Sequence, residues 1–422
     1  MTSPDLVPAL ASAYAVLTAG AEQVLPAGGL AAKLTEADHR GRPLRIKLGI
    51  DPSGSELTIG HAVVLRKLRQ FQDHGHLAVL IVGDFTGMVG DPSGRSATRN
   101  LLSAEQTAAN SASYFDQIMR ILDPDHVEVR RNSEWLAGLT MADVVRESAQ
   151  LTVAGLLERD DFAKRFAARQ PISLVEFLYP LLQGYDSVAV RADVELGGTD
   201  QTYNLLVGRD LQKAHGQPPQ VVLTVPLLEG LDGVQKMGKS LGNYVSITEP
   251  PAEQFGKLMS IPDALIGRYA QLATDLSPDR VTELAALAGS GGRPAGAAKR
   301  AMAAAVVALY HGDRAAREAE QRFDTVFRER AAPVDLPEHP LPGIDPVHLP
   351  ELLRAVGFVP STSQGRRLID DGAVRLDGEP VPAGGYDQPR TLLVGAVLSA
   401  GRRRMARLTE SPPAVDLART AD

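Results

Sequence analysis

Two short segments, far apart in the sequence, carry residues suited to phosphate chemistry. Gly60 and His61 stand where a helical pattern begins, and Lys236 and Lys239 belong to the segment Lys-Met-Gly-Lys-Ser. The free N–H groups and the positive dipole end of a helix N-terminus bind anions, and an imidazole there donates one more hydrogen bond. Mobile lysine ammonium groups can follow charge as it moves between phosphates. Either segment alone is more often a helix cap or a solvated turn, so each gains its meaning from the other.

The first segment follows a strand and a glycine-rich turn and opens a helix. Residues 44–48 alternate as in a strand, Gly49 and Asp51 belong to the turn, and the apolar residues within 64–71 have helical spacing. Residues 77–82 form a nearly continuous apolar run, which is typical of a strand buried on both faces of a parallel sheet. Ligands bind at the carboxyl ends of such strands, so we expect the turn to lie in a binding site.

The loop that follows the second strand, residues 83–95, contains four glycines and two aspartates. This composition suits a loop that folds over a small ligand, and it also suits a surface turn. Asp91 lies within the loop, Arg95 ends it, and Arg99 follows in a segment rich in Ser, Thr and Asn.

Further polar residues lie on one helix face and at the start of another helix. Tyr179, Gln183 and Asp186 are spaced i, i+4 and i+7, so they share one face. A core tyrosine with solvated neighbours has the same spacing. We expect a strand over 188–196, ending in Gly-Gly-Thr-Asp-Gln, where Asp200 or the preceding threonine is the natural cap of the next helix.

The composition is that of an ordinary globular protein. The chain has 422 residues, 44% hydrophobic and 23% charged, enough for two or three domains with a sizeable core. A net charge of −7 argues against a protein that coats nucleic acid non-specifically. The absence of cysteine excludes disulfides, zinc–thiolate sites and a thiol nucleophile. We recognise neither a leader peptide nor an apolar run long enough to span a bilayer, so the cytoplasm is the expected compartment.

The composition shifts along the chain and predicts four parts. Residues 1–250 hold the strand and helix patterns above, and residues 251–332 have helical periodicity and many Ala, Leu, Arg and Glu residues. Residues 333–346 contain five prolines, which predicts a semi-rigid linker. Residues 347–410 predict a capped helix and a strand that runs into an Asp-Gly turn. Within 350–409 nine arginines outnumber six acids, which suits an RNA-binding module or simply a solvated basic face.

Five motifs resemble those of the class I aminoacyl-tRNA synthetases, in this order: T-I-G-H, G-D-P-S-G-R, Y-P-L-L-Q-G-Y-D, G-G-T-D-Q and K-M-G-K-S. The middle three resemble the tyrosyl-tRNA synthetases of the bacterial kind, and residues 361–378 resemble the S4 RNA-binding fold. The resemblance covers nearly the whole chain. It implies an α/β fold with a Rossmann-like parallel-sheet catalytic domain, then an α-helical domain that helps to recognise the anticodon arm, and a small α+β S4-like domain.

The resemblance implies an ATP-dependent tyrosine–tRNA ligase. In this reaction the tyrosine carboxylate attacks the α-phosphate of ATP, pyrophosphate leaves, and tyrosine is then transferred to the 3′ end of tRNA(Tyr). Such an enzyme works by positioning and charge stabilisation and needs no covalent residue of its own. The implied partners are ATP with Mg²⁺, L-tyrosine, tRNA(Tyr) and a second copy of the chain in a homodimer. We expect no protein metal site and no membrane.

The resemblance also assigns roles to residues. The catalytic residues, which would act on the phosphates, are His61, Lys236, Lys239, Arg95 and Arg99. The ATP site would consist of Gly49, Asp51, Gly60, His61, Gly198, Asp200 and Lys239. The tyrosine site would consist of Asp91, Tyr179, Gln183, Asp186 and Gln201. In it, Asp186 would accept the phenol hydrogen bond, while Asp91, Tyr179 and Gln183 would bind the ammonium group. Arg366 and Arg367 would contact the tRNA.

Three residues depart from the family pattern. Thr58 stands where the first histidine of its motif is usual, and Gly238 replaces the usual middle serine of the lysine segment. Both departures bear on the rate of activation. Lys47 stands where some relatives have a tyrosine that helps to bind the phenol, which leaves the second partner of that hydroxyl open.

Two other functions share part of this pattern. One is a different adenylyl-transferring enzyme on the same fold, such as the tryptophan-specific sister, and the helix face of Tyr179 together with an S4-like tail argues against it. The other is a non-catalytic RNA-binding relative, against which the retained His61, Lys236 and Lys239 argue.

Overall fold

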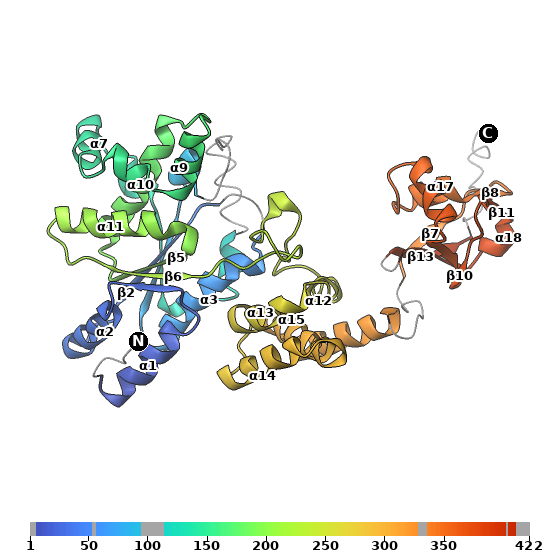
Figure 1. Cartoon of the computed structure of the whole chain (residues 1–422), viewed down its shortest axis with the longest axis horizontal. Helices are drawn as coiled ribbons and strands as arrows, with labels where there is room; N and C mark the ends of the chain where they lie inside the picture. The colour runs from blue at the N-terminus through green and yellow to red at the C-terminus, as the bar shows by residue number, and fades with distance from the viewer. Residues whose placement is uncertain (1–5, 53–55, 94–113, 328–335, 402–403, 411–422) are drawn as a thin grey trace, which may run out of the picture. The chain divides into compact units, whose positions relative to one another are not determined.

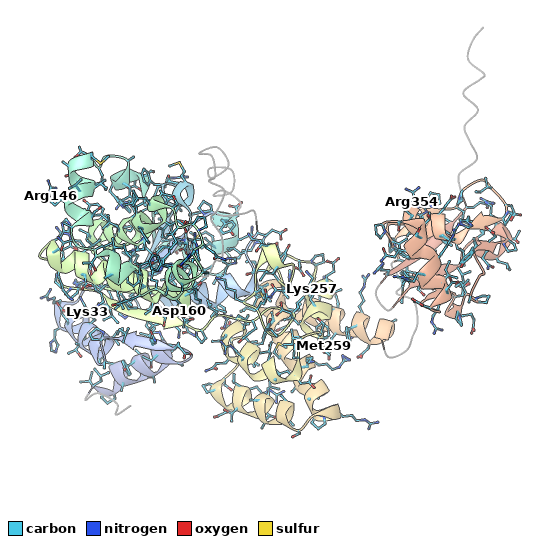
Figure 2. The ribbon with its side chains drawn as sticks, turned by 45° about the horizontal axis from the view of Figure 1, so that its top comes forward. Lys33, Arg146, Asp160, Lys257, Met259 and Arg354 are labelled. Carbon is cyan, nitrogen blue, oxygen red and sulfur yellow. The ribbon has the colours of Figure 1, made fainter. Side chains whose placement is uncertain are left out.

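The computed structural model describes residues 6–52, 56–93, 114–327, 336–401 and 404–410. The chain divides into two compact units, Met1–Ala315 and Ala316–Asp422. Figure 1 colours both units along the chain, and Figure 2 adds their side chains, with Lys33 marking the first unit and Arg354 the second. Within the described ranges, no helix has both the length and the apolar character needed to cross a membrane.

The first unit contains a six-stranded sheet. Its strands are β1 (Gln23–Leu25), β2 (Arg45–Ile50), β3 (Leu77–Val82), β4 (Val127–Arg131), β5 (Val194–Gly198) and β6 (Val221–Val225). They lie in the order β1-β6-β5-β2-β3-β4, with β1 antiparallel to β6 and all other neighbours parallel. The chain moves outward from β2 through β3 and β4, then returns to the other side of β2. Ligands of such sheets bind at this switch point, beyond the carboxyl ends of β2 and β5.

Helix α3 (Ile59–Asp73) packs against one face of the sheet and starts within the T-I-G-H motif. Its apolar residues Leu65, Leu68 and Phe71 are fully buried, as their helical spacing predicts. The core strands β2 and β3 are buried on both faces, which the continuous apolar run of β3 predicts.

Two long helices, α10 (Leu174–Val190) and α11 (Thr202–Ala214), pack against each other beside the sheet. A side chain at Gly184 would place its Cβ 2.8 Å from Leu211 and 3.0 Å from Val207. Glycine therefore allows the close approach of these helices, which brings the polar face of α10 over the ends of β2 and β5.

The prediction of a strand over 188–196 is wrong for the first residues of that range. Helix α10 continues to Val190 and ends at Arg191, whose φ of 50° is left-handed, and the strand begins only at Val194. Val188 and Val190 are both buried on the helix. A short run of apolar β-branched residues fits a buried strand and a buried helix equally well, so periodicity alone does not separate the two.

Shorter helices complete the sheet part of the unit: α1 (Pro8–Thr18), α2 (Gly29–Arg40), α4 (Thr86–Val89), α6 (Ser133–Leu136), α7 (Met141–Ser148), α8 (Val153–Leu156) and α9 (Asp160–Ala167). After the sheet come α12 (Pro251–Leu258), α13 (Ile266–Ala273), α14 (Pro278–Gly289) and α15 (Gly292–Phe327), where the sequence predicts helices. α15 is interrupted at Gly312, which has a φ of 84°. In Figure 2, Lys257 and Met259 mark the end of α12.

The second unit is a small α+β module. Its strands are β7 (Glu338–Pro340), β8 (Val347–His348), β9 (Val374–Leu376), β10 (Glu379–Pro380), β11 (Asp387–Gln388), β12 (Val397–Ala400) and β13 (Arg404–Thr409). Its helices include α16 (Leu349–Ala355), α17 (Thr362–Asp370) and α18 (Arg390–Leu393). Five strands form one sheet in the order β10-β9-β12-β13-β7 over an apolar core that includes Leu353, Ile369 and Leu398. The predicted fold class, a parallel α/β domain followed by helices and a small α+β module, is confirmed.

Part of the segment that the sequence predicts to be a linker belongs to this sheet. Residues 338–340 form β7, which pairs in parallel with β13, and the N–H of Leu341 donates to the carbonyl oxygen of Thr409 at 2.9 Å. Leu341 is fully buried. Proline is tolerated in an edge strand, so a proline-rich composition does not exclude the pairing.

Candidate active site

Asp51, just beyond the end of β2, joins three elements at the switch point. Its carboxylate accepts hydrogen bonds from Thr86 Oγ1 on α4 at 2.7 Å and from Tyr179 Oη on α10 at 2.8 Å. Gly83 makes this possible, because a side chain there would collide with both Asp51 and Thr86. At Gly49, which the sequence places in the turn but which lies near the end of β2, an added Cβ would meet no atom within 4 Å, so the chain leaves open space there.

Thr58 and His61 cap the start of α3 reciprocally. The main-chain N–H of His61 points to Thr58 Oγ1 at 3.3 Å, and His61 Nδ1 accepts from the main-chain N–H of Thr58 at 3.2 Å. Since Nδ1 is the acceptor, the hydrogen of the neutral ring lies on Nε2. Burial, followed by the charges of Lys239 and Lys236, lowers the pKa of His61 to about 4. His61 is therefore a neutral hydrogen-bond donor at neutral pH.

The segment Lys-Met-Gly-Lys-Ser, residues 236–240, forms a loop that we call the lysine loop. It lies directly beside the start of α3. The N–H of Ile59 donates to the carbonyl oxygen of Val245 at 2.9 Å, and the N–H of Ile247 donates to that of Leu57 at 3.0 Å. Gly60 lies against Met237, 3.4 Å from the position that a Cβ would take. Main-chain hydrogen bonds thus tie the start of α3 to the residues that follow the lysine loop, and Gly60 lies against the loop itself.

Asn243 holds the lysine loop in shape. Its Oδ1 accepts from the N–H of Gly238 at 2.9 Å, and its Nδ2 donates to the carbonyl oxygen of Lys236 at 3.3 Å and to Asp232. Gly238 has an ordinary extended φ of −156°, and an added Cβ would meet no atom closer than 3.7 Å. The backbone therefore does not require glycine at this position, and the serine of the family pattern would fit.

Both lysines of the loop have partners in this structure. Lys236 Nζ lies 3.0 Å from Asp200 at the start of the turn after β5, and Lys239 Nζ donates to Tyr114 Oη at 2.9 Å and to the carbonyl oxygen of Glu56 at 2.8 Å. Gly198 allows Asp200 to fold back, because a Cβ there would lie 2.8 Å from the Asp200 carboxylate. Lys236, Asp200 and Asp51 thus come from segments near the carboxyl ends of the central strands.

The polar residues around Gln183 and Gln201 are connected to one another by hydrogen bonds. Asp91 accepts from Gln201 Nε2 at 2.8 Å and from the N–H of Ser93 at 2.8 Å. Asn204 Nδ2 donates to Gln201 Oε1 at 3.1 Å and to Gln183 Oε1 at 3.0 Å. The structure therefore brings three predicted tyrosine-site residues together through Asn204, which the sequence analysis did not select.

Asp186 lies buried on α10 and has two partners that the sequence analysis missed. Trp135 Nε1 donates to its Oδ1 at 2.8 Å, and Asn132 Nδ2 donates to its Oδ2 at 3.4 Å. Burial raises the pKa of Asp186 to about 7, although the Lys47 charge and these two hydrogen bonds oppose the rise. Trp135 is the single tryptophan of the chain, which was the one available sequence signal.

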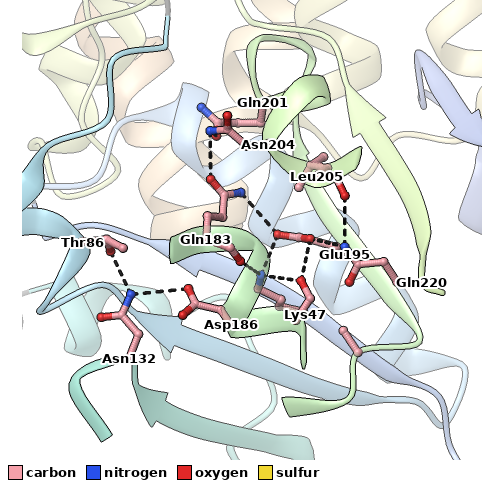
Figure 3. A network of polar contacts seen from close by, with 12 residues as sticks. Lys47, Thr86, Asn132, Gln183, Asp186, Glu195, Gln201, Asn204, Leu205 and Gln220 are labelled. Carbon is pink, nitrogen blue, oxygen red and sulfur yellow. Dashed lines mark hydrogen bonds and ion pairs between the residues drawn. The ribbon is translucent and has the colours of Figure 1, made fainter. Parts of the chain in front are cut away.

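Lys47 does not contact Asp186 but forms a buried ion pair with Glu195, its neighbour across β2 and β5. Its Nζ lies 2.9 Å from Glu195 Oε1 and donates to Ser187 Oγ at 2.8 Å and to the carbonyl oxygen of Gln183 at 2.7 Å. Figure 3 shows this arrangement beneath Gln183, with Asp186 to one side. Lys47, which stands where some relatives have a tyrosine, thus holds Glu195 and the main chain of Gln183.

Some predicted residues lie outside this cluster. Arg95 and Arg99 fall outside the described residues. Arg366 and Arg367 are exposed on α17 in the second unit, and the guanidinium of Arg366 lies 5.7 Å from the centre of the Tyr386 ring. Among the described residues, no group of three or more His, Asp or Glu side chains is placed to hold a metal ion.

Comparison with known families and proteins agrees with this geometry. Residues 39–328 match the family described as tRNA synthetases class I (W and Y), and residues 349–386 match the S4 domain. The chain is 49% identical to the tyrosine–tRNA ligase of Moorella thermoacetica, covering 93% of this chain and 94% of that protein. It is 50% identical to the tyrosine–tRNA ligase of Thiobacillus denitrificans, covering 92% and 97%.

Solved structures show the same fold at lower identity. The tyrosyl-tRNA synthetase of Archaeoglobus fulgidus, solved with L-tyrosine, has a TM-score of 0.60 at 22% identity and covers 74% of this chain and 99% of that one. A truncated mitochondrial tyrosyl-tRNA synthetase of Aspergillus nidulans also has a TM-score of 0.60, at 21% identity, covering 76% and 94%. With these matches and the adjacent motifs in view, the chain belongs to the class I tRNA synthetases (W and Y), and within them to the tyrosine–tRNA ligases that carry an S4 domain.

Proposed function

We propose that this chain activates L-tyrosine with ATP to give tyrosyl-adenylate and pyrophosphate, and then transfers tyrosine to the 3′ end of tRNA(Tyr). The observation that carries the proposal is the position of the T-I-G-H segment beside the lysine loop: Gly60 lies against Met237, and main-chain hydrogen bonds join residues 57–59 to residues 245–247 just after the loop. It sets a neutral imidazole donor and two ammonium groups beside one helix N-terminus. That is the arrangement needed to stabilise charge on ATP phosphates during an in-line attack.

The ATP site of the proposal consists of Gly49, Asp51, Gly60, His61, Gly198, Asp200 and Lys239. Open space at Gly49 and the switch-point location support the placement of the nucleotide there. His61, Lys236 and Lys239 would act on the phosphates, and Arg95 and Arg99 would join them. Lys236 would exchange its partner Asp200 for phosphate oxygens as negative charge develops.

Tyrosine would bind between the polar face of α10 and the loop after β3. Asp186 is the proposed acceptor for the phenol hydroxyl, because a buried carboxylate with two fixed donors has an oxygen lone pair to spare. Asp91, Tyr179 and Gln183 would take the ammonium group, with Gln201 supporting Asp91. Both the phenol and the ammonium would then meet fixed acceptors, and the acceptor for the phenol would distinguish tyrosine from phenylalanine.

Mg²⁺ is proposed to arrive with ATP, because Mg²⁺ sites commonly combine one or two carboxylates with the phosphates of the substrate. Asp51 and Asp200 are the carboxylates of the proposed ATP site that could contribute to it. The cytoplasm is the proposed compartment, since charging of tRNA serves translation there.

The second unit is proposed to hold the tRNA. It matches the S4 domain and exposes Arg366 and Arg367 on one helix. Phosphate contacts from such arginines position an RNA without reading its sequence.

A homodimer is also part of the proposal. Five apolar side chains on neighbouring helices are between 62% and 77% exposed: Met141, Val145, Val153, Phe166 and Leu174. They belong to α7, α8, α9 and the start of α10, and Arg146 and Asp160 mark the first and third of these helices in Figure 2. Large exposed apolar side chains on consecutive helices favour a protein interface in this part of the chain.

The test is ATP–pyrophosphate exchange measured with each standard amino acid in turn. We expect exchange with tyrosine alone, and charging only of tRNA(Tyr). Exchange that depends on another amino acid, or none with any of them, would contradict the proposed function. Sedimentation of the same protein tests the dimer, which a double charge substitution at Val145 and Phe166 should dissociate.

A further inference from the structure

A chain of side-chain amides runs from one buried charge to another through the proposed tyrosine site. Arg159 donates to Asn204 Oδ1 at 2.9 Å, Asn204 Nδ2 donates to Gln183 Oε1 at 3.0 Å, and Gln183 Nε2 donates to Glu195 Oε1 at 3.3 Å. Figure 3 shows the last two of these contacts. Arg159, Asn204 and Glu195 are buried, at 6%, 1% and 0% exposure.

The two charged ends fix the direction of every hydrogen bond between them. A guanidinium group only donates and an ionised carboxylate only accepts, whereas an amide can do either, depending on which way it is turned. Arg159 therefore forces Asn204 to present its oxygen to Arg159 and its nitrogen to Gln183. Glu195 forces Gln183 to turn its nitrogen toward Glu195 and its oxygen the other way. The two ends impose the same orientation on Gln183.

Lys47 keeps Glu195 in this role. Its ammonium uses all three hydrogens, on Glu195, on Ser187 and on the carbonyl oxygen of Gln183, so it holds both the carboxylate and the main chain of Gln183. Glu195 also accepts from Ser187 Oγ at 3.0 Å and from Gln220 Nε2. Neither Lys47 nor Glu195 is exposed, and a buried pair with complete hydrogen bonding has few alternative geometries.

The same polarity continues to Asp91. Asn204 Nδ2 also donates to Gln201 Oε1, and Gln201 Nε2 then donates to Asp91 Oδ2. An amide oxygen has two lone pairs, and Asn204 uses one of those on Gln183. The other remains for an incoming donor, and an ammonium group carries only donors.

We propose that Glu195, held by Lys47, and Arg159 are positioning residues that select the amino group of the substrate by fixing the direction of the Gln183 carboxamide. The inference rests on the proposed function, which puts the tyrosine ammonium at Gln183. None of the three residues needs to touch the substrate. If the Gln183 amide were turned over, its NH₂ group would face the ammonium and repel it.

Glu195→Gln tests one end of the chain. Glutamine has the same shape, but one carboxylate oxygen becomes an NH₂ group that must face donors, and the remaining neutral oxygen accepts from Gln183 more weakly than a carboxylate does, so the hold on the direction of Gln183 weakens. The matched control is Asp193→Asn, two residues earlier. Asp193 is also a buried carboxylate, and it accepts from Lys33, Arg42 and the main-chain N–H of Arg45 instead of from Gln183.

The measurement is calorimetric binding of two ligands to the full chain: L-tyrosine and 3-(4-hydroxyphenyl)propanoate, which lacks the amino group. We expect Glu195→Gln to weaken tyrosine binding about 10-fold or more, the range for a hydrogen bond to a charged group, while the analogue changes little. Asp193→Asn should leave the ratio of the two affinities unchanged. Asn204→Asp changes the end of the chain at Arg159 and leaves the Lys47–Glu195 ion pair intact. Because aspartate cannot donate a hydrogen bond to Gln183, we expect the same selective loss of tyrosine affinity.

Equal losses for tyrosine and the analogue in Glu195→Gln and Asn204→Asp would show that the network only supports the fold, and would overturn the inference. The same holds if Asp193→Asn lowers the ratio as much as they do. If the unaltered chain binds no tyrosine, the proposed function itself fails.

Discussion

Thr58 and His61 hold each other: the hydroxyl oxygen of Thr58 lies 2.8 Å from His61 Nδ1, and the main-chain N–H of each residue points to the side chain of the other. The departure from the family's histidine at position 58 therefore has a clear consequence. Thr58 completes a capping box at the start of α3 and fixes the tautomer of His61, so that Nε2 carries the hydrogen.

The first prediction concerns this neutral donor. Because the pKa of His61 is lowered to about 4, its ring does not titrate near neutrality, and its role is hydrogen-bond donation rather than proton transfer. We expect His61→Gln, whose Nε2 can donate, to keep more activation rate than His61→Ala. Both variants should keep the shape of the pH–rate profile between about pH 6 and about pH 8. Single-turnover formation of tyrosyl-adenylate measures this, and a variant that removes an ionisation near neutrality would contradict it.

The second prediction concerns the lysine loop. We expect Lys236→Ala or Lys239→Ala to slow activation by roughly 10²-fold or more, as for other fixed charges that act on a transition state. Tyrosine affinity should hardly change, because neither lysine contacts the network around Gln183. Adenylate formation and tyrosine binding are measured on the same samples. Weak binding with a normal rate for bound tyrosine would mean that the loop is structural.

The third prediction concerns the phenol. Asp186→Ala should reduce discrimination against phenylalanine by about 5- to 150-fold, which corresponds to about 1–3 kcal/mol for a buried polar group left without its partner. Trp135 loses its acceptor in this variant, whereas Asn132 still donates to Thr86, so Trp135→Phe is the control for the lost Trp135 hydrogen bond. The measurement is kcat/KM for tyrosine divided by kcat/KM for phenylalanine, in the unaltered chain and in both variants. An unchanged ratio in the alanine variant would reject the role of Asp186.

The fourth prediction is a pH dependence of tyrosine binding. The pKa of Asp186 is raised to about 7 in the free chain, so below that pH the group is protonated and accepts a hydrogen bond poorly. A phenol donor favours the ionised form, and binding should therefore strengthen as pH rises through about 7 and then level off. In Asp186→Asn, which does not ionise, this step should be absent. Calorimetry at several pH values checks both, and a step that persists in the asparagine variant would come from another group.

The fifth prediction concerns the α+β module of the second unit, which a shortened chain would lack. Ending the chain near Pro340 would cut within the sheet that β7 forms with β13, so the better end is Phe327. We expect this shorter chain to keep tyrosine-dependent pyrophosphate exchange and to lose most tRNA charging. Arg366→Ala together with Arg367→Ala should move the full chain partway to the same state.

The lost tRNA affinity should be its salt-sensitive part, because each phosphate contact releases counterions. Exchange and charging are therefore compared at about 50 mM and about 200 mM salt. A shortened chain that charges tRNA as well as the full one would show that the second unit does not hold the RNA.

The sequence by itself determined the elements whose signal is local or repeated. The apolar run of β3, the helical spacing of Leu65, Leu68 and Phe71, and the order of the five motifs depend on neighbouring residues, so they are readable without the fold. The i, i+4, i+7 spacing likewise places Tyr179, Gln183 and Asp186 on one face of α10. It does not say which neighbours that face meets.

Only the tertiary structure determined which residues the polar side chains of the site contact. Lys47 and Glu195 are far apart in sequence and carry no motif, but parallel pairing of β2 with β5 makes them neighbours and removes water from both. Trp135 and Asn132 reach Asp186 only because the segment after β4 closes against α10. Hydrogen bonds between distant segments depend on topology and burial, and neither can be read from spacing along one chain.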